Sequence, residues 1–285
     1  IALLLCFYTG CSKKTTLDME PIYLGVYESE LDKNYKVSST FLGSSSQIVS
    51  TDFDFSKEFP KELCKSILEQ NAVPHIQLNP WLWGDEEAIQ YTNILNGEWD
   101  EFLLEWARAA EVFEYPIMVS FAPLFNLEDK PWSIYKNNKD PDSFIRAFRY
   151  IVTLFRQAGA QNIIWVWHPH IESYPDYKWN DLWSLYPGDD VVDWVGVTGL
   201  FDTKYRLAKP STYNQLFSLF VRMSNRYTSK KPILLFTEVK SGDPNFLSDL
   251  TVYLQSTLSH VTGIVFNISS DITEDIQQSI KEEVN

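Results

Sequence analysis

The chain has 285 residues, of which 45% are hydrophobic and 15% aromatic, a composition typical of one large globular domain rather than a disordered or fibrous chain. Its 24 basic and 38 acidic residues give a formal net charge of −14, and the basic residues gather only in short pairs such as Lys13-Lys14. Because phosphate binding requires a cationic surface, this balance argues against nucleic acid as a partner.

The N-terminal segment combines an apolar run with a cysteine. Ile1 to Tyr8 is apolar and is followed by Thr9-Gly10-Cys11. Small residues before a cysteine resemble a bacterial lipoprotein signal, which is cleaved just before the lipid-modified cysteine. We therefore predict a signal segment over 1–11, a polar tether over 12–20 and a single domain over 21–285, anchored to a membrane of the bacterial cell envelope through Cys11. An ordinary signal peptide or a cut membrane anchor is the alternative.

The cysteine pattern predicts no metal site. Cys6, Cys11 and Cys64 have neither metal-ligand spacing nor an even number for disulfide pairing. Cys64 lies in a helical pattern, which favours a partly buried thiol. No cofactor is predicted.

Eight short apolar runs, spaced along the chain, predict β-strands. Longer amphipathic segments separate them, and this alternation indicates βα units around a parallel sheet. The runs are Tyr23–Val26, Gln47–Ser50, Val73–Gln77, Ile117–Phe121, Ile163–Trp167, Val192–Val197, Ile233–Phe236 and Gly263–Phe266.

Two segments predict long helices. Apolar residues recur at helical spacing over 99–113 and again over 142–158. Asp140-Pro141 is a suitable start for the second helix, and Gly159 marks its end. Eight strand-helix units in about 265 residues fit a (β/α)8 TIM barrel, with an open doubly wound sheet as the alternative.

The ends of the predicted strands carry many aromatic side chains. Chemistry in a barrel lies at the C-terminal ends of its strands. Flat rings stack on the apolar faces of sugars, so an aromatic cleft at the barrel mouth indicates a glycan site, although aromatic side chains also form ordinary core. The predicted sugar-binding residues are Trp81, Trp83, Asn126, Trp132, Trp167 and His168.

Glu238 is the best single catalytic carboxylate in the sequence. It directly follows the apolar seventh strand and would project into the barrel mouth. Glycoside hydrolysis generally requires two facing carboxyl groups, about 5–5.5 Å apart for retention or about 6.5–9.5 Å apart for inversion. A lone glutamate at a strand end is otherwise an exposed loop residue.

Several longer strings resemble glycoside hydrolase family 26, the β-mannanase family. They are Gly97 to Ala110, Asp142 to Arg149, Asn162 to Trp167 and Tyr186 to Gly196, the last containing Tyr-Pro-Gly-Asp-Asp and Asp-Trp-Val-Gly. The resemblance covers roughly residues 22 to 268. It implies a (β/α)8 barrel and an endo-acting retaining glycosidase of β-1,4-linked polysaccharide.

The resemblance also implies a departure at the acid/base residue. The family pattern at the end of strand four is Arg-Phe-Ala-His-Glu-Met-Asn, and here it is Ser120-Phe121-Ala122-Pro123-Leu124-Phe125-Asn126. Leu124 thus occupies the position of the acid, and leucine cannot donate a proton.

The strand-seven region also departs from the family. Glu238 matches the nucleophile, with one apparent extra residue before it that a bulge could absorb. The family's Asp-Gly-Tyr-Asn after strand six is Thr198-Gly199-Leu200-Phe201 here, so a hydroxyl that orients the nucleophile is lost.

Two hypotheses follow from these departures. In the first, the barrel binds a β-1,4-linked polysaccharide and is catalytically impaired. In the second, it is an active retaining endo-β-mannanase or related enzyme, with Glu238 as nucleophile and a relocated acid such as Glu128. His168 and His170 could bind sugar hydroxyls, but two histidines alone make a poor metal site.

Overall fold

A computed structural model describes residues 23–29, 31, 47–84, 89–199, 231–238 and 261–267, with Glu238 described by its backbone only. The predicted signal segment, Cys11 and the tether lie outside these residues. The lipid anchor and the cell-envelope location therefore stay predictions.

The eight predicted strands form one closed parallel barrel, in which each strand pairs with its neighbours in chain order. This confirms the (β/α)8 fold, and the open doubly wound sheet is wrong. The second strand runs four residues beyond its predicted end. The strands are β1 Tyr23–Tyr27, β2 Ile48–Asp54, β3 Val73–Asn79, β4 Ile117–Phe121, β5 Ile163–Trp167, β6 Trp194–Thr198, β7 Ile233–Glu238 and β8 Val261–Asn267.

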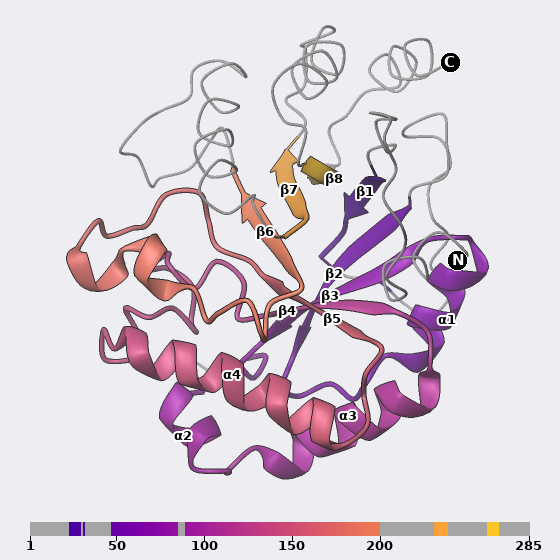
Figure 1. Ribbon diagram of the computed structural model, residues 1–285, viewed down its shortest axis with the longest axis horizontal. Helices are drawn as coiled ribbons and strands as arrows, with labels where there is room; N and C mark the ends of the chain where they lie inside the picture. Colours follow the sequence, from indigo (N-terminus) through magenta and orange to yellow (C-terminus); the bar gives the residue numbers. More distant parts are fainter. Residues whose placement is uncertain are drawn as a thin grey trace, which may run out of the picture.

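The described helices lie outside the barrel beside β2 to β5 (Figure 1). They are α1 Lys61–Glu69, α2 Tyr91–Leu95, α3 Asp100–Phe113 and α4 Pro141–Gln157, so both predicted long helices are confirmed. The Asp140 carboxylate accepts from the backbone N–H groups of Asp142 (3.1 Å) and Ser143 (3.3 Å), as its predicted capping role requires. Cys64 is buried in α1, and burial raises the pKa of its thiol to about 12.

The core has two layers, because side chains alternate between the two faces of each strand. One layer fills the barrel interior and includes Met118, Val166 and Leu234. The other lies between the strands and the helices and includes Trp165 and Trp167. His75 is also buried in the interior, where its ring nitrogens contact the hydroxyls of Ser50 and Ser120, each at 2.8 Å.

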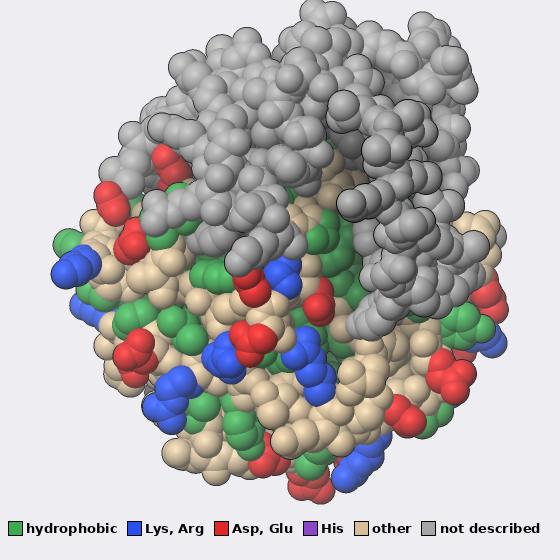
Figure 2. Space-filling view, in the orientation of Figure 1, with side chains coloured by type: hydrophobic (Ala, Val, Ile, Leu, Met, Phe, Trp, Pro, Cys, Tyr) green, Lys and Arg blue, Asp and Glu red, His purple; other side chains and the backbone are tan. Residues whose placement is uncertain are grey.

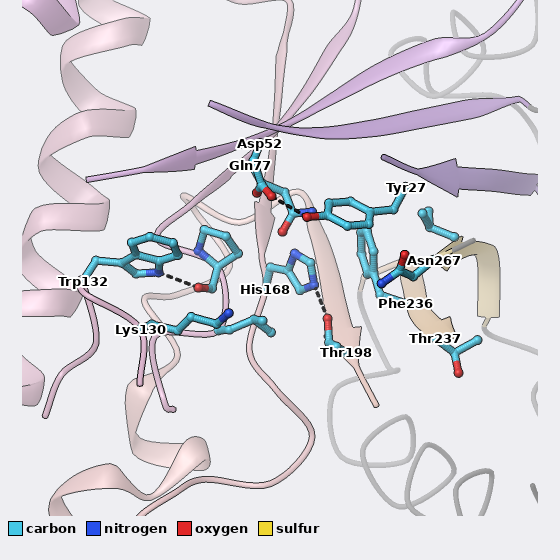
Figure 3. A pocket seen from close by; sticks show the side chains of 13 residues that line it. Tyr27, Asp52, Gln77, Lys130, Trp132, His168, Thr198, Phe236, Thr237 and Asn267 are labelled. Carbon is cyan, nitrogen blue, oxygen red and sulfur yellow. Dashed lines mark hydrogen bonds between the residues drawn. The ribbon is translucent and has the colours of Figure 1, made fainter. Parts of the chain in front are cut away.

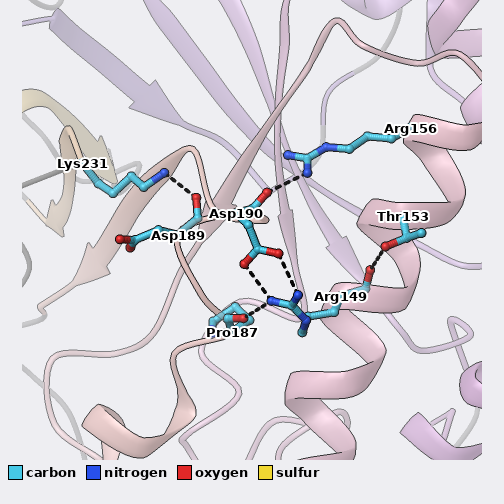
Figure 4. A network of polar contacts seen from close by, with 7 residues as sticks. All are labelled: Arg149, Thr153, Arg156, Pro187, Asp189, Asp190 and Lys231. Carbon is cyan, nitrogen blue, oxygen red and sulfur yellow. Dashed lines mark hydrogen bonds and ion pairs between the residues drawn. The ribbon is translucent and has the colours of Figure 1, made fainter.

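The Tyr-Pro-Gly-Asp-Asp string fastens the chain before β6 to helix α4 (Figure 4). Arg149 of α4 forms a two-pronged ion pair with Asp190, at 2.8 and 2.7 Å, and also donates to the Pro187 carbonyl. Arg156 donates to the Asp190 carbonyl, and Lys231 donates to the Asp189 carbonyl. These contacts therefore stabilise the scaffold where the chain leads into β6.

Replacing Gly188 by alanine is expected to destabilise this connection. Gly188 has a φ of +115°, and an added Cβ would lie 2.8 Å from a carboxylate oxygen of Asp190 and 3.0 Å from the Arg149 guanidinium. We expect Gly188→Ala to reduce the free energy of unfolding by about 1–3 kcal/mol, measured by thermal or urea unfolding. Gly84→Ala is the control, since Gly84 has a φ of +92° with no neighbour within 4 Å. Equal losses in both variants would mean that the contacts at Gly188 contribute nothing.

The described surface mixes charges of both signs. On the face seen in Figure 2, acidic and basic side chains are interspersed over the described part of the chain. Within the same residues, none of the helices has the length and apolarity needed to cross a membrane.

Candidate functional site

A cavity of about 200 Å³ lies at the C-terminal ends of the strands, where a barrel carries its chemistry (Figure 3). Residues of β1 to β3 and of β6 to β8 line it, together with His168 directly after β5 and the loop after β4. The lining is Tyr27, Asp52, Gln77, Pro123, Leu124, Lys130, Trp132, His168, Thr198, Phe236, Thr237, Val265 and Asn267.

Leu124 lines the cavity from the loop that follows β4. Its φ is +57°, a left-handed conformation that is uncommon for leucine, and Ala122 has a similar φ of +49°. The Leu124 backbone N–H donates to the His168 carbonyl at 2.8 Å, which holds this turn against the end of β5. Such a backbone is sparsely populated, and in this chain Asn71, Glu114, Asn138 and Lys139 also adopt it outside the cavity lining. An aliphatic side chain therefore lines the cavity at the position that we predict to match the family's acid.

Asp52 of β2 brings a carboxyl group to the cavity. It accepts hydrogen bonds from the Tyr27 hydroxyl and from the Asn79 amide, the latter at 3.3 Å. Burial raises the pKa of Asp52, while both hydrogen bonds and the positive charges of Lys130 and Lys57 lower it, leaving the pKa raised overall. Burial and the neighbouring carboxylate raise the pKa of Tyr27 well above its usual value, so its hydroxyl stays protonated. The Asp52 carboxyl group thus lines the cavity and is held in place by two donors, the Tyr27 hydroxyl and the Asn79 amide.

His168 forms the floor of the cavity beside Phe236. The two rings stack with centroids 4.0 Å apart, and one ring nitrogen of His168 hydrogen-bonds to the Thr198 hydroxyl at 2.7 Å. Burial holds the pKa of His168 well below its usual value, so the ring is neutral at pH 7. Its Nδ1 has no hydrogen-bond partner among the described residues.

His170 is part of the loop that follows β5. It is buried, and its Nδ1 lies 2.8 Å from the Glu172 carbonyl oxygen. Burial lowers its pKa to about 4. In the part of the chain that the structure describes, no three His, Cys, Asp or Glu side chains gather in a way that could hold a metal ion.

Three further predicted residues are tryptophans, one in the cavity lining and two after the end of β3. Trp132 lines the cavity, and its indole N–H donates to the Pro123 carbonyl at 2.7 Å, which fixes the ring beside the turn that carries Leu124. Trp81 and Trp83 follow β3 with ring centroids 5.5 Å apart, and Trp83 is 70% exposed. An indole that is this exposed contributes little to the core and is available to a ligand.

The two predicted catalytic glutamates lie in different surroundings. Glu238 is the last residue of β7, paired in register with Asn267, which lines the cavity. The register of β7 against β8 shifts once, between Ile233 and Leu234, which is the other end of the strand. Leu234 and Phe236 pack in the barrel interior, and position 238 has the same parity along the strand. Glu128 is half-buried on the loop after β4, where its N–H donates to the Tyr174 carbonyl, and it does not line the cavity.

Asn126 and Trp167 are buried and do not belong to the cavity lining. The Asn126 side chain is buried and exchanges hydrogen bonds with the backbone of His170, at 2.9 Å in both directions. Trp167 is 0% exposed and packs against Phe125 and Tyr186 in the layer outside the barrel. These contacts indicate that both residues support the loops around the cavity. Contact of either side chain with sugar stays a prediction.

Sequence reasoning missed Asp52, Tyr27 and Lys130 as cavity residues. Asp52 lies beyond the predicted end of the second strand, and its alternation with Ser50 was the available signal. Tyr27 follows the first predicted strand in the same way. Lys130 reaches the cavity from a loop, and loops carry no periodicity from which its direction could be read.

Sequence comparison identifies the family and partial relatives. The sequence model described as Glycosyl hydrolase family 26 matches residues 84–257, more than half of the chain. The chain is 24% identical over 152 residues to endoglucanase H of Acetivibrio thermocellus, covering 53% of this chain and 16% of that protein. It is 31% identical over 107 residues to the β-1,3-xylanase TXYA of a Vibrio species, covering 37% and 21%. The matched regions thus span about a fifth or less of these relatives.

Solved structures match over nearly the whole chain. A family 26 endo-β-1,4-mannanase catalytic domain from a Bacillus species superposes with a TM-score of 0.65 at 11% identity, covering 86% of this chain and 76% of that one. A family 26 β-mannanase from Bacteroides ovatus superposes with a TM-score of 0.62 at 18% identity, covering 92% and 86%. At these identities the structures support the fold alone. With the family match over more than half of its length, the chain belongs to glycosyl hydrolase family 26.

Proposed function

We propose that this barrel engages a β-1,4-linked polysaccharide, β-mannan or a related glycan, and is impaired in hydrolysing it. The glycan assignment is supported by solved relatives whose descriptions name β-mannanase activity, one of them from a termite protist in complex with a gluco-manno-oligosaccharide. The cavity supports it as well, since it presents an indole, a neutral histidine and several hydroxyl and amide groups, as polyhydroxylated ligands require.

The observation that carries the impairment is the side chain at position 124. Leu124 lines the cavity from the end of β4, and an aliphatic group can neither protonate a leaving oxygen nor activate water. General acid assistance is typically worth about 10²–10⁴-fold in rate. Loss of that assistance without replacement makes hydrolysis of an unactivated glycosidic bond slow.

The second candidate is an active retaining endo-β-mannanase or related endo-glycosidase with Glu238 as nucleophile. Glu238 ends β7 beside the cavity-lining Asn267, which favours this reading. Glu128 as the relocated acid is disfavoured, because its neighbour Lys130 lines the cavity and Glu128 does not.

Binding and bond cleavage must be measured separately. Purified protein is titrated with β-mannan, glucomannan and mixed-linkage glucan by calorimetry, and new reducing ends are counted in the same samples. The proposal expects binding with slow or undetectable cleavage. Cleavage at ordinary enzymatic rates that Glu238→Ala abolishes would establish the active enzyme instead. Failure of every polysaccharide to bind would remove both functions.

Trp83→Ala is expected to weaken polysaccharide binding by about 10-fold. Stacking one face of this exposed indole against a sugar removes several tens of Å² of apolar surface from water, worth about 1–2 kcal/mol. Calorimetric titration measures the change. Tyr115→Ala is the control, because Tyr115 is 50% exposed but precedes β4 and so lies at the other end of the barrel. Equal affinities of the Trp83 variant and the parent protein would remove Trp83 from the binding surface.

The envelope anchor is a separate proposal. The Thr9-Gly10-Cys11 string supports lipid attachment at Cys11. The intact mass of the mature protein from its native host tests this attachment, and an unmodified Cys11 would overturn it.

A further inference from the structure

The cavity holds a carboxyl group on a different strand from the one where the family places its acid. Asp52 lines the cavity from β2 (Figure 3), and Leu124 lines the same cavity from the loop after β4. The Asp52 carboxyl is fixed by the Tyr27 hydroxyl and the Asn79 amide, so its direction is set by two neighbouring strands.

In the closed barrel, β2 and β4 are separated from β7 by the same number of strands, counted in opposite directions. Around the barrel, β7 reaches β4 in three steps through β6 and β5, and it reaches β2 in three steps through β8 and β1. A proton donor on β2 therefore faces the end of β7 across the same number of strands as a donor on β4. Glu238, Asn267 and Tyr27 are register neighbours along this second path, and the Tyr27 side chain contacts Asp52.

We propose that Asp52 is the proton donor for the residual hydrolysis of a β-1,4-linked glycan in this cavity, replacing the group that is missing at position 124. The inference rests on the proposed function, since it concerns a glycan bound at the same site. The inference concerns the slow hydrolysis that an impaired barrel retains. Asp52 takes the place of Glu128 as the candidate for the relocated acid.

The charges around Asp52 suit a carboxyl group that gains and loses a proton. Burial raises its pKa, as an acid catalyst requires. Opposing this, Tyr27 on β1 and Asn79 on β3 donate to it, and Lys130 on the loop after β4 and Lys57 after β2 contribute positive charge. His168, which also lines the cavity, is neutral at pH 7. Burial thus favours the protonated form of Asp52, and these neighbours favour its carboxylate form.

The reaction balances with water as the only co-reactant. In the first step the Glu238 carboxylate attacks the anomeric carbon, the glycosidic C–O bond breaks, and the Asp52 proton passes to the leaving oxygen. In the second step Asp52, now a carboxylate, takes a proton from water while the water oxygen attacks the anomeric carbon. The glycosyl ester bond to Glu238 then breaks, which regenerates both carboxyl groups.

Asp52→Asn in the full chain tests the assignment. We expect the release of reducing ends from β-mannan to fall at least 10²-fold. With a dinitrophenyl β-mannobioside, whose leaving group needs no proton, formation of the glycosyl-enzyme should stay within about 10-fold of the parent protein. Sodium azide, which attacks without a general base, should then accelerate turnover of that substrate by the variant and not by the parent. Equal losses on both substrates with no azide effect would overturn the proposal, because that is the pattern of a structural role.

Two controls separate Asp52 from its surroundings. Asp54→Asn removes a carboxylate from the same strand, outside the cavity lining, and should leave mannan hydrolysis unchanged. Tyr27→Phe removes a donor to the Asp52 carboxylate, so the alkaline limb of the kcat/KM profile should move to higher pH. This second variant keeps the test decisive if Asp52→Asn does not fold, and an unmoved limb would overturn the proposal.

The remaining outcomes distinguish the inference from the function on which it rests. Mannan hydrolysis that survives Asp52→Asn, or that is lost in Glu128→Gln, would overturn the role of Asp52. Tight binding of mannan by the parent protein with no reducing ends after prolonged incubation would also overturn it, and would leave the binding function intact. Absence of mannan binding would instead overturn the proposed function itself.

Discussion

Replacing Leu124 by glutamate is expected to raise the rate of β-mannan hydrolysis by about 10²-fold. The substitution restores a proton donor at the position where the family pattern has its acid, and general acid assistance is worth about 10²–10⁴-fold. We expect the lower end of that range, because Pro123 stands where the family has a histidine and because the left-handed backbone at position 124 is retained. Reducing-end assays over a range of pH measure the gain.

Leu124→Gln is the matched control for this prediction. Glutamine has the size and shape of glutamate but carries no acidic proton, so it should give no gain in rate. The glutamate variant should also acquire an alkaline limb in its pH profile that the glutamine variant lacks. If the two variants hydrolyse mannan at the same rate, the missing acid is not what limits this barrel.

The barrel itself could be predicted from the sequence because its signals are local. Each strand is a short apolar run. For α4, Asp140-Pro141 marks the start of the helix and Gly159 marks its end. Eight repeats of one βα unit then favour a closed barrel over an open doubly wound sheet, and the structure shows the closed order. Even the string around Gly188 could be recognised, although the structure shows that its contacts fasten helix α4 and lie apart from the cavity.

The membership of the cavity could be predicted only in part, because it depends on which face of each strand a residue occupies. Trp167 and His168 are adjacent at the end of β5, yet one packs outside the barrel and the other lines the cavity. Because β5 is apolar on both faces, its sequence does not show which side chains point into the barrel, so Trp167 and His168 were both predicted to bind sugar. Asp52 was missed for a different reason, since β2 continues past its apolar stretch and its partner Tyr27 is 25 residues away.

Lowering the pH from about 7 to about 5 is expected to destabilise the protein by several kcal/mol. His75, His168 and His170 are buried, and burial lowers the pKa of His75 to about 3 and of His170 to about 4, with that of His168 also well below its usual value. In the unfolded chain each titrates near 6.5. Below that pH the unfolded state binds more protons than the folded state, so stability is lost as the pH falls. Each histidine contributes up to about 1.4 kcal/mol per pH unit.

Calorimetric melting temperatures across this range test the prediction. Three such histidines give about 6 kcal/mol between pH 6.5 and 5, which corresponds to a fall of about 10 °C or more. The raised pKa of Asp52 acts in the opposite direction, because the folded state binds this proton more readily than the unfolded chain does, so this group offsets part of the loss. His75→Gln removes one titrating ring from between Ser50 and Ser120, so its melting temperature at pH 7 should be lower while its fall toward pH 5 becomes about a third smaller. A melting temperature that stays level from pH 7 to 5, or a variant that falls as steeply as its parent, would mean that these rings already bind protons in the folded barrel.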